Sequence, residues 1–196
     1  MNRREWLKSM SALAIGAIAG PSLLAVFDAH AASQAPAARP EFFDPAQYSL
    51  VGAVSDIIIP RTDTPGAVDA GVPLFMDQLF KAVYAKDEQA RYLDAAAAFD
   101  KAGGKPFLQL SDAQRKALVN KLHAEALATP KGGKLTPASD FVLMTKKLTM
   151  LGFFLSQPGC TQVLQYDPVP ARWQPDIPLS QAGNGHAWAV EASLKI

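Results

Sequence analysis

Few side chains in this sequence combine the types and the spacing that catalysis or metal binding requires. Four aspartates recur along one stretch of the chain: Asp56, Asp63, Asp69 and Asp77. Carboxylates of this kind bind Ca²⁺ when a compact loop gathers six to eight oxygens, and the D-x-D-x-D-G run of such a loop is missing here. We therefore interpret these aspartates structurally. Asp63 is expected to order a turn, and Asp69 to cap the approach to the helix that follows.

Histidine and cysteine do not supply a recognisable site either. Beyond the first 31 residues the chain has His123, His186 and Cys160, and it lacks C-x-x-C-H, G-x-S-x-G and H-E-x-x-H. Gly183-Asn184-Gly185 does not follow a strand and open a helix, so it does not form a dinucleotide loop. We interpret His123 as a solvated residue and Cys160 as a small buried hydrophobe, although pairing of Cys160 with another chain stays open. The sequence predicts a non-catalytic body with no metal or cofactor of its own.

Composition limits the class of partner. The chain has 196 residues, of which 49% are hydrophobic, and its formal net charge is +1. Residues 1–31 carry three basic and two acidic side chains, so the remainder has 19 − 3 = 16 basic against 18 − 2 = 16 acidic. A neutral body of this size suits one globular domain. It has no basic stripe, which argues against nucleic acid as a partner.

Residues 1–31 have the order of an export signal. Arg3 and Arg4 are followed by a weakly apolar segment at 10–27 and by the small-x-small sequence Ala29-His30-Ala31. This order resembles a twin-arginine leader, which predicts recognition by the twin-arginine translocase and a periplasmic location. Cleavage after the leader is favoured. A retained membrane anchor is the alternative. The 18-residue segment is only just long enough to span a bilayer, and Gly16, Gly20 and Pro21 weaken it.

Hydrophobic periodicity predicts a small all-α bundle of about five helices. A linker at 32–43 should precede a helical domain at 44–165, and an extended, proline-rich arm should follow at 166–196. Asp44-Pro45-x-Gln47 and Ser111-x-x-Gln114 mark two helix starts, since both have the capping-box pattern. The expected helices are 45–59, 73–84, 87–101, a segment from 112 to about 129, and 137–156.

Two helices carry specific expectations. In the helix at 73–84, the side chains of Asp77, Gln78 and Lys81 should face away from the apolar stripe. The segment 148–155 is apolar nearly all round, so it should lie in the centre of the bundle or beneath a partner.

The loop between the first two helices is dense in turn-forming residues. Proline fixes φ and cannot continue a helix, glycine supplies positive φ, and Asp and Thr bond to nearby backbone. Arg61 could bond loop carbonyls or a partner carboxylate, and the sequence leaves this open. The residues of this loop motif are Pro60, Arg61, Thr62, Asp63, Thr64, Pro65, Gly66, Asp69, Gly71 and Pro73.

The pattern I-I-P-R-T-D-T-P-G-A-x-D-A-G-V-P at 58–73, with the apolar 152–154 segment and Y-D-P-V-P at 166–170, resembles gluconate 2-dehydrogenase subunit 3. The resemblance implies a non-catalytic small subunit that escorts a leaderless, FAD-containing large subunit through twin-arginine export. It also implies a cytochrome c subunit that holds the complex at the inner membrane, so FAD and haem c are expected in the partners. Alternatives are a free-standing periplasmic ligand-binding protein and an independent cofactor-binding oxidoreductase.

The C-terminal arm is expected to dock on the large subunit. Prolines pre-set its backbone, so less conformational entropy is lost on binding. Its contact residues should be Tyr166, Arg172, Trp173 and Trp188, since Tyr, Trp and Arg are enriched at binding hot spots. The alternative is that the arm lies over its own bundle and covers Phe153 and Phe154.

Overall fold

The computed structural model describes residues 39–130 and 132–166, together with residues 176, 178, 180 and 186. Arg3, Arg4, Arg172, Trp173 and Trp188 lie outside the described residues. The described part is helical and contains no strand, which confirms the predicted all-α bundle. Its helices are α2 (Pro45–Ile58), α3 (Val72–Ala82), α4 (Lys86–Lys101), α5 (Asp112–Ala128) and α6 (Pro137–Leu155), with a 3₁₀ turn η2 (Phe107–Gln109) and a π-helical turn η3 (Gly159–Val163).

The helix starts follow from local capping chemistry. The Asp44 carboxylate accepts the Gln47 N–H at 2.8 Å, and the Gln47 side chain accepts the Asp44 N–H at 3.0 Å. Ser111 and Gln114 make the same reciprocal pair at the start of α5. Thr136 accepts the Ser139 N–H at 3.2 Å at the start of α6. These caps satisfy amide groups that a helix terminus leaves without partners, which is why the predicted starts are confirmed.

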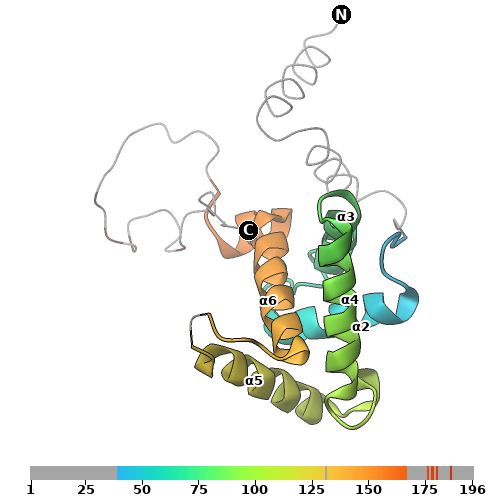
Figure 1. Cartoon of the computed structure of the whole chain (residues 1–196). Coiled ribbons are helices and arrows are strands. Elements are labelled where there is room, and N and C mark those ends of the chain that lie inside the picture. Colours follow the sequence, from blue (N-terminus) through green and yellow to red (C-terminus); the bar gives the residue numbers. More distant parts are fainter. Residues whose placement is uncertain are drawn as a thin grey trace, which may run out of the picture.

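Helix α6 is the centre of the bundle. It contacts α2, α3, α4 and α5, and Figure 1 shows it beside α4, with α5 crossing below the two. Its buried hydroxyls also find partners, since Thr145 bonds Tyr92 at 2.9 Å and Thr149 bonds Ser55 at 3.1 Å. The apolar segment 148–155 is therefore explained by burial within this chain. Only its outer edge remains open, with Met150 39% and Leu155 44% exposed.

One expectation for α3 is wrong. Asp77 does not face solvent, because its side chain is only 1% exposed. Its two carboxylate oxygens accept the backbone N–H groups of Glu41, Phe42 and Phe43 at 2.8, 3.0 and 2.7 Å. Burial raises the pKa of Asp77, and the hydrogen bonds from the Phe43 and Phe42 N–H groups oppose that shift without cancelling it. Asp77 thus fixes the segment that enters α2 against the middle of α3.

The anchored segment completes an aromatic core. Phe42 stacks on Phe80 at a centroid distance of 5.5 Å, and Phe43 meets Phe80 at 5.7 Å. The Phe80 ring also packs on Tyr84 and Tyr92 at 4.5 and 4.3 Å. Burial raises the pKa of the Tyr92 phenol far above its ordinary value, so Tyr92 is a neutral hydrogen-bonding group in this core.

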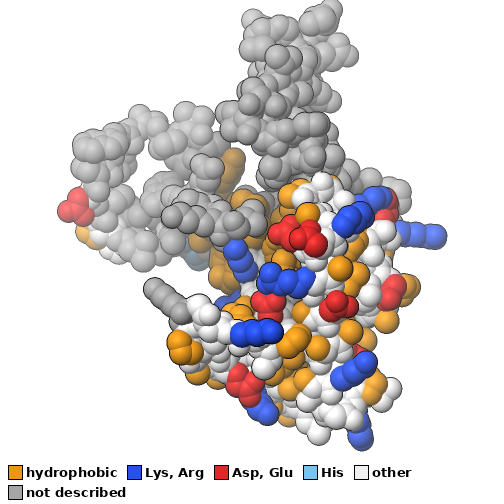
Figure 2. All heavy atoms as spheres, in the orientation of Figure 1, with side chains coloured by type: hydrophobic (Ala, Val, Ile, Leu, Met, Phe, Trp, Pro, Cys, Tyr) orange, Lys and Arg blue, Asp and Glu red, His pale blue; other side chains and the backbone are white. Residues whose placement is uncertain are grey.

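Charged side chains are interspersed over the visible face of the molecule. In Figure 2, acidic and basic groups alternate over the body, and neither sign forms a continuous patch. This arrangement agrees with the charge balance of the sequence. On this face the described residues form no basic stripe.

Candidate functional site: a groove beside the loop motif

Asp69 organises the loop motif. Its carboxylate accepts the Arg61 Nε–H at 2.7 Å, forms a second contact with Arg61 Nη2, and accepts the Gly66 N–H at 3.0 Å. Arg61 therefore pairs with a carboxylate of its own loop. The hydrogen bonds from Arg61 and then from Gly66 lower the pKa of Asp69. Because both oxygens are engaged in this way, Asp69 does not cap α3. That expectation is wrong, since the N-cap is Gly71 and no side chain caps it.

Two glycines give the loop its path. A Cβ on Gly66 would lie 2.6 Å from the Arg61 nitrogen and 3.0 Å from the Ile59 carbonyl oxygen, so only glycine fits there. Gly71 has φ of 75°, a left-handed conformation that glycine adopts without strain. The Ala67 N–H donates to the Ile59 carbonyl at 2.9 Å and closes the loop onto the end of α2. The turn chemistry seen in the sequence thus produces a defined surface feature.

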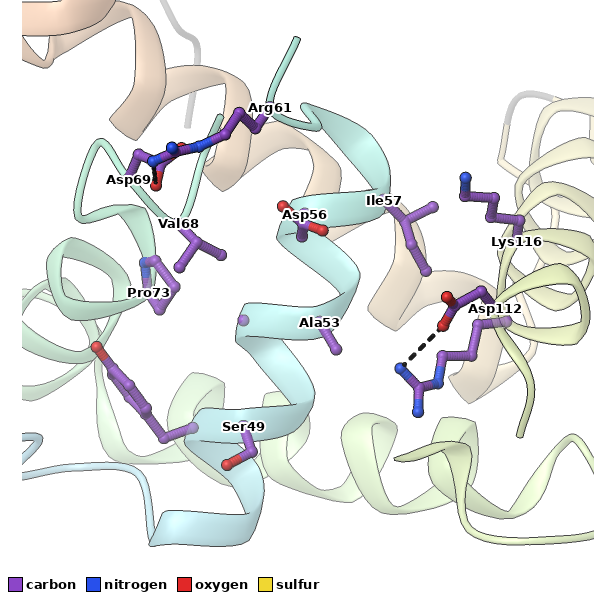
Figure 3. A pocket seen from close by; sticks show the side chains of 13 residues that line it. Ser49, Ala53, Asp56, Ile57, Arg61, Val68, Asp69, Pro73, Asp112 and Lys116 are labelled. Carbon is purple, nitrogen blue, oxygen red and sulfur yellow. Dashed lines mark hydrogen bonds and ion pairs between the residues drawn. The ribbon is translucent and has the colours of Figure 1, made fainter. Parts of the chain in front are cut away.

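A groove of about 760 Å³ lies between this loop and the start of α5, with the outer face of α2 as its floor. Figure 3 shows α2 in the middle, the loop with Val68 and Pro73 on one side, and Asp112 and Lys116 on the other. The floor includes Ser49, Gly52 and Ala53, which are small and let a partner approach α2 closely. We name this feature the motif groove. Its lining is completed by Tyr48, Asp56, Ile57, Arg61, Asp69 and Arg115.

The charges of the motif groove fall into two sets. Arg115 is held in place, since its Nε donates to the Phe107 carbonyl at 3.3 Å and its Nη1 lies 3.6 Å from Asp112. Asp56 and Lys116, by contrast, form no ion pair with any described residue, and both are exposed. One acidic and one basic group are therefore available to a ligand in this groove.

Two hydroxyl groups, those of Tyr48 and Ser49, line the groove. The Ser49 hydroxyl donates to the Pro45 carbonyl at 2.7 Å, so it is not paired with a base. Burial, and then the charge of Asp77, raise the pKa of Tyr48, which keeps it a neutral phenol. Nucleophilic catalysis needs a nucleophile within hydrogen-bond reach of a base, and the groove lining provides no such pair.

Elsewhere the structure corrects one expectation and tests others. His123 is half-buried rather than fully solvated, and its Nε2 lies 2.9 Å from Lys146 Nζ. Cys160 is a half-buried free thiol whose Sγ donates to the Phe154 carbonyl at 3.0 Å, and burial raises its pKa.

Across the described residues, no three His, Cys, Asp or Glu side chains gather as a metal site. No helix of that same part combines the length and the apolar character needed to cross a membrane.

Sequence reasoning located the loop motif but not the groove. Tyr166, the one predicted docking residue within the described part, is 57% exposed and lies beyond η3, outside the groove lining. The sequence predicts a structural role for Asp56, and no sequence pattern marks Lys116 as a site residue. A usable signal was present, since Ser49, Gly52 and Ala53 have the i, i+3, i+4 spacing of one helical face.

We expect Asp69→Asn to loosen the loop motif without unfolding the bundle. The change removes the charge that Arg61 and Gly66 share, so the Gly66 amide should exchange with solvent about tenfold faster. The melting temperature should hardly change, because exposed ion pairs contribute little to stability. Since pairing lowers the pKa of Asp69, this ordering is complete above its ordinary pKa and is lost as the pH falls through the lowered value. Asp63→Asn in the same loop is the control, and equal Gly66 exchange in both variants would contradict the assignment.

Comparison with known proteins gives one result. The family model described as gluconate 2-dehydrogenase subunit 3 matches residues 45–170, which include α2, the loop motif and all of α6. No curated protein and no solved structure matches the chain. The matched range is 126 of 196 residues, more than half of the sequence.

Proposed function

Since the chain belongs to the gluconate 2-dehydrogenase subunit 3 family, we propose that it is the non-catalytic small subunit of a periplasmic, FAD-dependent sugar or sugar-acid dehydrogenase. In this role it binds a leaderless flavoprotein subunit in the cytoplasm, carries it through the twin-arginine translocase and stabilises it afterwards. FAD resides in that large subunit, and haem c in a cytochrome subunit that holds the complex at the inner membrane.

The observation that carries this proposal is the match of residues 45–170 to the family model. The loop motif within that range is ordered by its own hydrogen bonds, so its shape does not depend on a bound ligand. A surface that is formed in advance loses little entropy on association. The motif groove beside it has a small-residue floor and two unpaired charges, which suits a protein partner.

The C-terminal arm is the second docking element that we propose. Tyr166 at its start is 57% exposed, which leaves a large aromatic surface open next to η3. Trp173, Trp188 and Arg172 follow in the sequence and supply residue types that dominate binding energy at interfaces. The motif groove and the arm together would bind the flavoprotein at two surfaces. Two linked contacts bind more tightly than either contact alone.

Export gives the direct test. Replacing both Arg3 and Arg4 by Lys should leave this subunit and the flavoprotein together in the cytoplasm. The reason is that the large subunit has no export signal of its own in this proposal. Fractionation of cells, followed by immunodetection of both subunits and a periplasmic dehydrogenase assay, measures the effect. Lys8→Arg, which keeps the charge and the twin arginines, should behave like the unchanged protein.

Two results would count against the escort role. The flavoprotein could reach the periplasm in active form in the double variant, which would show that it has its own route. Alternatively, the unchanged subunit could be recovered from native membranes without any flavoprotein attached, which would remove the partner altogether. Flavin or haem bound stoichiometrically to the isolated subunit would instead favour an independent oxidoreductase.

A further inference from the structure

A smaller pocket lies at the end of α2, where that helix meets α5 and α6, and it shares Ile57 with the motif groove. Its volume is about 260 Å³. Four aliphatic side chains line it, and the polar groups come from α5 and α6 only: Ile57, Ile58, Val119 and Val142 form the walls, with Asn120, His123 and Lys146. Apolar walls with a few converging polar groups are the usual composition of a ligand site.

The polar end of this pocket holds a contact between a lysine and a histidine. Lys146 Nζ lies 2.9 Å from His123 Nε2. An ammonium group has three N–H donors and no acceptor, so this contact engages one of the three. This contact orients the lysine and leaves two of its N–H groups for another acceptor. Asn120 lines the same pocket, and its amide makes no hydrogen bond with a described residue.

The positive charge in this pocket has no carboxylate beside it. None of the seven lining residues is acidic. The carboxylates on the two helices concerned are engaged elsewhere in the described part, since Glu125 pairs with Lys121 at 3.9 Å, Asp112 with Arg115 at 3.6 Å and Asp140 with Arg91 at 3.0 Å. Asp56, next to Ile57 in sequence, lines the motif groove instead. A half-buried ammonium without a counter-charge favours binding of an anion.

We propose that this pocket binds a carboxylate carried on a short aliphatic stem. One carboxylate oxygen accepts from Lys146 and the other from the Asn120 amide, while the stem lies between Ile57, Ile58 and the two valines. Such a group has two sources: a free short-chain carboxylic acid, or a glutamate side chain of the flavoprotein partner. The second source rests on the proposed function, and the first does not.

The first arm of the test uses butyrate as the probe and the full chain as the protein. Titration followed by NMR should give saturable shifts of the His123 ring and the Asn120 side-chain amide. Lys146→Met keeps the aliphatic length and removes the charge, so it should weaken binding at least about tenfold. Butyramide, which has the same stem and no charge, should bind correspondingly weakly. Lys121→Met, on the same helix as His123 but outside the pocket, should leave binding unchanged.

The second arm measures the affinity of the flavoprotein for the subunit. If the carboxylate belongs to the partner, Lys146→Met should lower that affinity at least about tenfold, Lys121→Met should not, and excess butyrate should compete. If the ligand is a free carboxylic acid, butyrate should bind and Lys146→Met should leave the affinity for the flavoprotein unchanged. Failure of the unchanged subunit to bind flavoprotein would reject the proposed function, while the first arm alone would then decide the pocket. Absence of butyrate binding together with an unaffected or absent complex overturns the site.

Discussion

Replacing Asp77 by Ala should lower the free energy of unfolding by about 3 kcal/mol, although the residue lies on a helix that shows an ordinary apolar pattern. The carboxylate accepts three consecutive backbone N–H groups, and its removal leaves all three without this acceptor, the Phe43 N–H in a buried place and the other two in partly buried ones. For a chain of this size the melting temperature should fall by about 6–12 °C. Thermal and urea unfolding measure the change.

The effect should begin at the N-terminal edge of the bundle. Phe42 and Phe43 depend on these hydrogen bonds for their place against Phe80, so the amides of residues 41–43 should lose exchange protection in Asp77→Ala. Asp77→Asn retains one acceptor oxygen but directs an amide N–H₂ at one of the donors, so about half of the loss should remain.

Asp56→Ala provides the matched control for this prediction. Asp56 is also a helical aspartate, but it is exposed and forms no ion pair with a described residue. Its replacement should change stability by less than about 0.5 kcal/mol. Equal stability of Asp77→Ala and Asp56→Ala would show that the three N–H groups find water or another acceptor, and that Asp77 does not fix the segment.

The helices could be predicted from the sequence because the rules that set their ends are local. Asp44 with Gln47, Ser111 with Gln114, and Thr136 with Pro137 each define a start within four residues of sequence. Pro60 sets an end in the same way, and α2 stops at Ile58. Predicted bounds and observed bounds therefore differ by only one or two residues.

The polar interactions could not be predicted, because they depend on which helices meet. Asp77 finds its partners 34–36 residues earlier in the chain. Periodicity places Asp77 on the polar side of its helix, but α3 is buried on most sides in the folded bundle, so that side is covered as well. A signal was nevertheless present: Asp77 is four residues after Pro73 and three before Phe80, both of which are buried.

In the candidate site, too, local features could be predicted from the sequence and tertiary contacts could not. Turn chemistry identified the loop motif, yet the pairing of Arg61 with Asp69 needed the folded loop to bring residues eight apart into contact. The motif groove lies where α5 packs near α2, and the smaller pocket that contains Lys146 lies where α5 packs near α2 and α6. Such packing depends on tertiary contacts, and a single sequence does not encode it in a local pattern.

Among the described glycines, Gly159 should tolerate alanine least. An alanine Cβ would lie 2.0 Å from the Phe153 carbonyl oxygen and 2.9 Å from the Phe153 carbonyl carbon. Both are backbone atoms, so no side-chain rotation relieves the overlap. The chain turns back onto the end of α6 here, where Gly159 N–H donates to Ser156 Oγ at 3.1 Å and Ser156 Oγ donates to the Phe153 carbonyl at 2.6 Å.

The alanine must therefore displace either η3 or the last turn of α6. Phe153 is 2% exposed and belongs to the core, so the second outcome disrupts packing as well. We expect a loss of about 3 kcal/mol or more, and a melting temperature lower by about 6–12 °C. Loss of the Cys160 Sγ contact with the Phe154 carbonyl should make the thiol react faster with a thiol reagent, because its burial would end.

Gly52→Ala is the control that separates this overlap from any general effect of replacing glycine. A Cβ on Gly52 would meet only Pro73 Cγ at 3.8 Å, an ordinary contact, and Gly52 lies inside α2. Alanine is the better helix former, so Gly52→Ala should raise stability by about 0.5–1 kcal/mol. The two substitutions are chemically the same and should move the melting temperature in opposite directions. A stable Gly159→Ala protein with an unreactive Cys160 would mean that the turn after α6 accepts a side chain, and that its close approach to Phe153 is not required by the fold.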